Sequence, residues 1–150
     1  QRELGLTTLF VTHDQEEALT LSDRILLMDA GRIVQSGSAE ALYTEPASAF
    51  AAGFIGHYNL LDAEAAGRLL GRSMSRRVAI RPEAIRLGSG DLSGLIRSHS
   101  LLGNVIRYRV ESRGVELYVD VLNRSAGDLL PSGRSVALEI APEAVRELEG

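Results

Sequence analysis

The sequence contains neither cysteine nor lysine, and each absence excludes a kind of site. Without cysteine, the chain can form no disulfide bond and no thiolate metal site. The phosphate-binding P-loop has the pattern Gly-x-x-x-x-Gly-Lys-Ser/Thr, in which the lysine reaches the terminal phosphates of a nucleotide. All 16 cationic residues of this chain are arginine, so these 150 residues contain no P-loop.

Long apolar runs are also missing, since none approaches the roughly 18 residues of a membrane span. The opening residues 1–4 are mostly polar and resemble the tail of a helix, not a signal peptide. The net charge is −4, and a chain this acidic is not an obvious nucleic-acid binder. We expect a cytoplasmic protein that docks on a membrane partner. Its length suffices for one domain or two small ones.

The most informative stretch is an apolar run that ends at a histidine. The run predicts a strand over Leu6–Thr12, buried on both faces, because its apolar residues do not alternate with polar ones. His13 would lie at the strand's carboxyl end, where open α/β sheets bind ligands. A helix would follow over Asp14–Thr20, with Asp14 as N-cap and Glu17 completing a capping-box-like pair. The alternative is that His13 is an ordinary loop residue.

The rest of the first part reads as a hairpin and two short helices. The predicted elements are a strand over Asp23–Met28, a turn at Asp29–Gly31, a strand over Arg32–Ser36, a helix over Ala39–Tyr43 capped by Ser38, and a helix over Ala47–Ile55 with Pro46 in its first turn. We place a domain boundary near Gly56, which gives domains 1–56 and 57–150.

From Leu60 onward, brief strands and turns dominate. The predicted strands are Leu60–Ala65, a weak strand within 67–72, Arg77–Arg81, Ile85–Leu87, Leu92–Ser100, Ile106–Glu111, Val115–Val121 and Val136–Ile140, with a loop at Gly88–Gly90. The strongest signal is the alternation on both sides of the turn Arg113-Gly114, which indicates a hairpin. Such strands favour a small closed barrel or a sandwich, because these folds hide their edges.

Several separated motifs occur in the order of one family. They are Val11–Leu19, Ser22–Ile25 and Met28–Ile33. Residues 1–54 closely resemble the switch-histidine region of ABC transporter ATPase subunits, of the import subfamily with a C-terminal extension (maltose, polyamine, sulfate and ferric-iron importers). The implied fold is an α/β remnant of a P-loop ATPase domain followed by an all-β OB-like barrel.

The resemblance implies a role for His13 and its neighbours. His13 matches the switch histidine, which contacts the γ-phosphate of ATP and helps to align the attacking water, with Asp14 and Gln15 beside it in the nucleotide site. Asp14 alternatively only caps the helix. A full-length subunit would use ATP and Mg²⁺. This chain lacks the P-loop, signature and Walker B motifs, so we expect that it does not bind ATP tightly and does not hydrolyse it. The implied partners are a second copy of the subunit and membrane permease subunits.

The second part carries its own resemblance. The stretches Tyr58–Leu61 and Ala79–Ile85, and the closing strand, resemble the transport-associated OB-type domain called TOBE, which is appended to these ATPases. The most typical motif is Ile80–Glu83. The resemblance implies that the barrels of two subunits pack against each other and regulate transport.

A second class of function stays open at this point. OB-type barrels bind small oxyanions or oligonucleotides, so the chain could be a non-enzymatic oxyanion-binding module. Oligonucleotide binding is disfavoured because few aromatic residues are available for stacking. The arginines Arg76, Arg77, Arg81, Arg86, Arg107 and Arg109 suggest either an anion site or, in our preferred interpretation, a solvated face with ion pairs.

Three expectations complete the interpretation. His57 and His99 have no metal-ligand spacing, and we expect no metal site. The transported solute is not encoded here, with a weak preference for ferric iron or polyamine. The segment Leu6–Thr12 would have unpaired edges in this chain, so it should either lack regular structure or pair with another copy.

Overall fold

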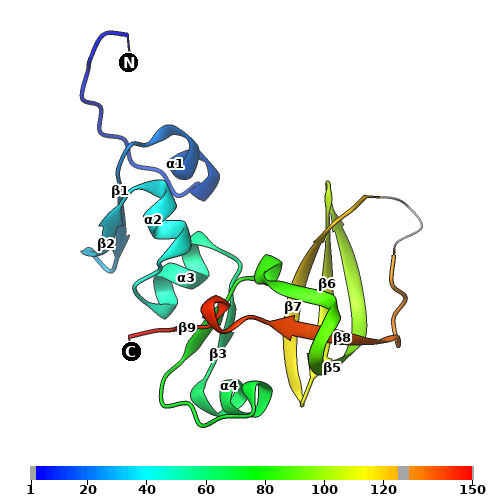
Figure 1. Cartoon of the computed structure of the whole chain (residues 1–150). Helices are drawn as coiled ribbons and strands as arrows, with labels where there is room; N and C mark the ends of the chain where they lie inside the picture. Colours follow the sequence, from blue (N-terminus) through cyan, green and yellow to red (C-terminus); the bar gives the residue numbers. More distant parts are fainter. Residues whose placement is uncertain (1–2, 125–128, 150) are drawn as a thin grey trace.

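The structure, a computed structural model, describes residues 3–124 and 129–149 and shows two groups of elements along the chain (Figure 1). The first group packs three helices against a two-stranded sheet. Its elements are α1 (Gln15–Leu21), β1 (Ile25–Asp29), β2 (Arg32–Gly37), α2 (Ala39–Thr44) and α3 (Ala49–Ile55). Among the helices of the described ranges, none is long and apolar enough to cross a bilayer.

Side-chain caps fix the starts of the three helices. Asp14, Ser38 and Ser48 each accept a hydrogen bond from the backbone N–H three residues later, at 3.0, 3.1 and 3.2 Å. Each cap satisfies an N–H of the first turn that has no partner inside the helix. The starts of α1 and α2 are as predicted. The start of α3 is two residues later than predicted, because Ser48 and not Pro46 begins the helix.

The hairpin of β1 and β2 supplies the core of the first group. Ile25 and Leu27 of β1 are buried and pack against Leu42 of α2. The turn has φ +46° at Ala30 and +78° at Gly31, and this left-handed pair is what a two-residue hairpin loop requires. The predicted hairpin is therefore confirmed, and its apolar face holds α2 and α3 in place.

The predicted buried strand over Leu6–Thr12 is wrong for this chain. The segment belongs to no strand of the described sheets, and Leu9 and Val11 are 86% and 96% exposed. A strand buried on both faces depends on neighbouring strands and on covering layers. None of the strands in the described part of the chain pairs with this segment, so it is extended and exposed.

The second group is a barrel with a small sheet beside it (Figure 1). Its sheets have the strand orders β7-β6-β5-β8 and β3-β4-β9, all antiparallel. Its elements are β3 (Asn59–Leu61), α4 (Ala63–Leu70), β4 (Val78–Ile80), η1 (Pro82–Ala84), β5 (Ile85–Leu102), β6 (Val105–Ser112), β7 (Val115–Leu122), β8 (Ser135–Ile140), η2 (Pro142–Ala144) and β9 (Arg146–Glu147). The prediction was an α/β remnant of a P-loop ATPase domain followed by an all-β OB-like barrel. The OB-like β fold is confirmed, since the described part of the chain is mostly β with a few helices, α4 among them, whereas the P-loop remnant stays a prediction.

The alternation predicted for the central hairpin is confirmed. The buried residues of β6 and β7 are Ile106, Tyr108, Val110, Val115, Leu117 and Val119. The turn between them has φ +50° at Arg113 and +71° at Gly114, again suited to a tight hairpin. The Tyr108 hydroxyl accepts a hydrogen bond from the backbone N–H of Leu130 at 3.1 Å, so its polar end is satisfied inside the barrel.

Helix α4 replaces the strands predicted over Leu60–Ala65 and 67–72. The Asp62 side chain accepts from the Ala65 N–H at 2.7 Å and starts the helix. Gly71, with φ +67°, ends it in the left-handed conformation that favours glycine. The cap, the alanine-rich run and the terminal glycine were helix signals in the sequence that the strand interpretation overlooked.

Strand β5 runs through the predicted loop at Gly88–Gly90. Leu87 and Leu92 both align with Leu138 of β8, so the residues between them form a bulge within one long strand. Gly90 has φ +94°, and a Cβ there would lie 2.3 Å from the Leu138 carbonyl oxygen. The glycines therefore allow a close strand contact, and they do not end the strand.

Asn59 is a buried polar residue that closes the barrel edge. Its Nδ2 donates to the Tyr118 carbonyl at 2.8 Å, and its Oδ1 accepts from the Tyr118 N–H at 2.6 Å. Strand β7 is the outer strand of its sheet, so this amide pairs with the edge as a neighbouring strand would. The contact joins β3 to the barrel.

We expect Asn59→Ala to lower the free energy of unfolding by about 2–3 kcal/mol, because both backbone groups of Tyr118 lose their partner. Urea unfolding followed by circular dichroism measures the change. Asn123→Ala is the matched control at an exposed position, and its effect should stay within about 0.5 kcal/mol. Equal losses in the two variants would contradict the role of Asn59.

Candidate functional site

His13 lies at the junction between the extended segment and α1. Its side chain is exposed, and it immediately precedes the capping residue Asp14. Gln15 is the first residue of α1 and is half-buried. The three residues predicted for the nucleotide site are therefore together at one helix start.

A small hydrogen-bond network shapes the backbone around His13. The Asp14 N–H donates to Thr12 Oγ1 at 3.0 Å, and the Thr12 hydroxyl donates to Glu17 Oε2 at 2.7 Å. The predicted capping box is thus half right: Asp14 caps Glu17, but the Glu17 carboxylate binds Thr12 instead of the Asp14 N–H. The network holds the residues on both sides of His13 and leaves its ring facing solvent.

The chemistry available at this junction is that of an imidazole at a helix start. A neutral imidazole donates one hydrogen bond and accepts another, so His13 can contact an anionic oxygen and a water together. The carboxylates of Asp14 and Glu17 are both engaged within the chain. We conclude that Asp14 caps the helix, and that His13 is the residue of the three with an exposed, chemically useful group.

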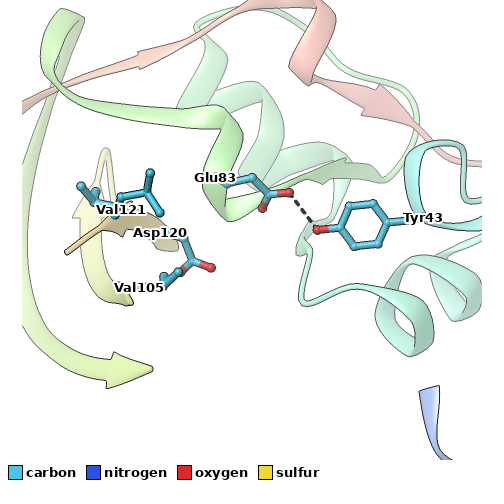
Figure 2. A pocket seen from close by; sticks show the side chains of 6 residues that line it. Tyr43, Glu83, Val105, Asp120 and Val121 are labelled. Carbon is cyan, nitrogen blue, oxygen red and sulfur yellow. Dashed lines mark hydrogen bonds between the residues drawn. The ribbon is translucent and has the colours of Figure 1, made fainter. Parts of the chain in front are cut away.

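A second feature is a hollow of about 280 Å³ between the two groups of elements. Figure 2 shows Tyr43 pointing toward Glu83 across it, with Asp120 and Val105 on the opposite wall. Its lining residues are Tyr43 from α2, Glu83 from η1, and Val105, Asp120, Val121 and Leu122 from β6 and β7. Residues from both groups thus form one hollow.

The polar groups of this hollow are already paired. The Tyr43 hydroxyl donates to Glu83 Oε1 at 3.0 Å, and the Arg81 guanidinium lies 5.9 Å from the centre of the Tyr43 ring. Asp120 forms a bidentate pair with Arg107, with distances of 2.8 and 2.7 Å. The carboxylates of Glu83 and Asp120 therefore each lie near an arginine. We interpret the hollow as part of the contact between the two groups of elements, and not as a ligand site.

The ionisation of these groups follows from burial and charge. Burial raises the pKa of Tyr43, and the nearby Glu83 carboxylate raises it further. Burial likewise raises the pKa of Tyr58, whose hydroxyl donates to the Tyr43 carbonyl at 2.6 Å. The hydrogen bond to Asp120 raises the pKa of Arg107. Because all three pKa values move upward from ordinary values that already lie above physiological pH, both tyrosines are neutral and Arg107 is charged there.

The structure separates the arginines that the sequence grouped together. Four of them lie near carboxylates, as the solvated-face interpretation expected: Arg81 near Glu83 (3.9 Å), Arg86 near Glu139 (3.9 Å), Arg107 near Asp120 (2.7 Å) and Arg109 near Glu116 (3.6 Å). The partner of Arg109 is Glu116, and Glu111 pairs with Arg97. Arg76 and Arg77 form no ion pair within the described residues.

The remaining histidines belong neither to the junction at His13 nor to the hollow at Tyr43 and Glu83. His57 and His99 are both exposed, and the residues that the structure describes contain no group of three or more histidine or acidic side chains able to hold a metal. Sequence reasoning missed the Tyr43–Glu83 contact, because the two residues are distant in the chain.

Comparisons with known proteins match both parts of the chain. The TOBE domain family matches residues 78–148. The spermidine/putrescine import ATP-binding protein PotA of Acidothermus cellulolyticus is 39% identical over 161 residues, covering 88% of this chain and 42% of the relative. The Fe(3+) ions import ATP-binding protein FbpC of Rhizobium etli is 35% identical over 159 residues, covering 92% and 44%.

A third relative extends the pattern. The uncharacterized ABC transporter ATP-binding protein YdcT of Escherichia coli is 39% identical over 135 residues, covering 88% of this chain and 40% of its own length. The chain thus spans about two fifths of the length of these curated relatives. Residues 78–148 thus match the TOBE domain family, and 88–92% of the chain is similar to ATP-binding proteins of ABC import systems.

Proposed function

We propose that this chain is the C-terminal part of the ATP-binding subunit of an ABC importer, the end of the nucleotide-binding domain (1–56) followed by a TOBE regulatory domain (57–150). The observation that carries the proposal is the similarity to import ATP-binding proteins across 88–92% of the chain, through both groups of elements. The parent subunit would couple ATP hydrolysis to solute uptake. The relatives favour this function over a stand-alone oxyanion-binding module.

In this proposal, His13 acts on the terminal phosphate of ATP. Phosphoryl transfer is catalysed mainly by positioning and by stabilising charge on the transferred group. An exposed imidazole, held by the Thr12–Asp14–Glu17 network, can donate to a γ-phosphate oxygen and keep an attacking water in line. Asp14 would position the helix start, and Gln15 would extend the polar surface beside it.

ATP and Mg²⁺ would be held mainly by groups that this sequence does not contain. It has no lysine for a P-loop, so the residues here add one contact to a nucleotide bound elsewhere. When bound, Mg²⁺ neutralises charge on the phosphates. The chain's own part is the imidazole of His13 and the capped helix that positions it.

The partners proposed for the subunit follow from the same family. They are a second copy of the subunit, whose barrel packs against this one, and permease subunits that bring the protein to the cytoplasmic face of the membrane. The solute would be a polyamine or ferric ion, because similar proteins are named for spermidine/putrescine and for Fe(3+) import.

Replacing His13 tests this function most simply. In a complete ATP-binding subunit assembled with its permease, His13→Ala should reduce ATP turnover by roughly 100-fold, as expected for loss of one group that stabilises the transition state. Nucleotide affinity should change little, because the phosphates keep their main contacts. Turnover is measured by phosphate release, and affinity with a fluorescent ATP analogue.

The control is His57→Ala, which removes an exposed histidine at the proposed domain boundary. This variant should retain full turnover. Normal turnover in His13→Ala, or an equal fall in both variants, would reject the assigned role of His13.

A further inference from the structure

Three hydrogen bonds around His13 run in one direction and form a closed ring. The Asp14 N–H donates to Thr12 Oγ1 at 3.0 Å, the Thr12 hydroxyl donates to Glu17 Oε2 at 2.7 Å, and the Glu17 N–H donates to Asp14 Oδ1 at 3.0 Å. Each of these residues thus donates once and accepts once within the ring. His13 lies between two of them in the sequence and contributes no group to the ring.

The bond between Asp14 and Thr12 encloses the backbone of His13. It is a turn closed by a side-chain hydroxyl, and it restricts both backbone dihedral angles of the enclosed residue. Those angles set the direction in which the imidazole leaves the chain. Within the described ranges, no residue forms a hydrogen bond or an ion pair with the imidazole itself. The position of the ring is therefore controlled through the backbone.

The carboxylate of Glu17 sets the direction of the Thr12 hydroxyl. A hydroxyl has a single hydrogen and two lone pairs, so it can donate to one group while it accepts from another. Glu17 Oε2 receives that hydrogen at 2.7 Å, a distance typical of a bond to a charged acceptor, and a lone pair is left facing the Asp14 N–H. Without an acceptor at this place, the Thr12 side chain would be free to rotate and the turn over His13 would loosen.

The neighbouring Glu16 provides an internal comparison. Both carboxylates lie in the first turn of α1, where negative charge interacts favourably with the helix dipole. Both residues are exposed, and Glu16 forms no hydrogen bond or ion pair with any residue that the structure describes. The two glutamates therefore carry the same charge in the same turn, and they differ in the contact with Thr12.

We propose that Glu17 is a positioning residue for His13 and acts through the hydroxyl of Thr12. This inference rests on the proposed function, because the imidazole needs a fixed direction only if it contacts a phosphate. The ring requires an acceptor oxygen from Glu17, and it does not require the negative charge. Glu17 has no contact with the nucleotide in this account, so it affects turnover and leaves affinity for ATP unchanged.

The ring can be tested in the 150-residue chain, without any assumption about ATP. Glu17→Met removes the acceptor and keeps a long side chain that favours helix. We expect the Asp14 amide to exchange with water roughly threefold faster or more, measured by magnetisation transfer in NMR, because its acceptor is no longer held. Glu17→Gln keeps an acceptor oxygen, and Glu16→Met removes the same charge from the same turn. Both should stay within about twofold of the unchanged chain.

Turnover in a complete ATP-binding subunit with its permease tests the role itself. Glu17→Met should lower kcat by roughly tenfold, less than the loss in His13→Ala, because the imidazole is still present but less well placed. The KM for ATP should change less than about twofold. Glu17→Gln should restore most of the turnover, and Glu16→Met should retain all of it. In His13→Ala, adding Glu17→Met should cause no further loss, because a positioning residue has nothing left to position.

The outcomes separate this proposal from the proposed function. Normal turnover in His13→Ala would reject both. With His13→Ala impaired, equal turnover in Glu17→Met and Glu16→Met would reject the positioning role alone. Two further results would also reject it: losses that multiply in the double variant, which would mean that Glu17 acts independently of His13, and a loss in Glu17→Gln as large as in Glu17→Met, which would mean that the charge matters and the acceptor oxygen does not.

Discussion

The pairing of the Asn59 side chain with the backbone of Tyr118 is the contact on which the second half of the molecule depends. Strand β7 is an outer strand, and one amide group both donates to it and accepts from it. An outer strand left open is a site for pairing with other chains. The same amide joins β3, and through it the sheet of β4 and β9, to the barrel. The same side chain therefore covers the edge of β7 and attaches the preceding segment to the barrel.

Contacts between distant parts of the chain give the two groups a shared boundary. Arg146 Nε donates to the Pro46 carbonyl at 3.1 Å, and the buried side chains of Ala52, Ala79 and Leu148 form a small core of their own. The Tyr43–Glu83 hydrogen bond lies nearby and involves η1, which follows β4. Movement of the first group would therefore displace η1 and the start of the barrel through these contacts. Such mechanical coupling is what regulation of one group by the other requires.

The sequence predicted those features whose signal is local. Alternation in β6 and β7, and the caps of α1 and α2, depend on residues a few positions apart, and the structure has them. Helix α4 replaces two predicted strands, although Asp62 and Gly71 mark its ends in the sequence. The role of Asn59 could not be foreseen, because its partner is far along the chain.

The strand expected over Leu6–Thr12 failed for a different reason. Its composition is that of a strand between two others, but no described strand pairs with it, so composition alone could not order it. For His13, the sequence identified the position and the resemblance supplied the role. The structure adds the network that holds the residues beside the imidazole. Ion pairs were expected for the arginines of the second part, and four of the six form them. Only the three-dimensional structure shows that Arg76 and Arg77 have no such pair within the described residues.

If the chain is the end of a nucleotide-binding domain, as we propose, residues 6–12 should form a strand when the rest of that domain is present. Amide hydrogen exchange at Leu9–Val11 tests it directly, by comparing the 150-residue chain with a complete ATP-binding subunit that includes it. The account predicts rapid exchange in the chain and protection by about a thousandfold or more in the subunit, since a central strand exchanges only on extensive unfolding. Rapid exchange in both, or equal protection in both, would contradict it.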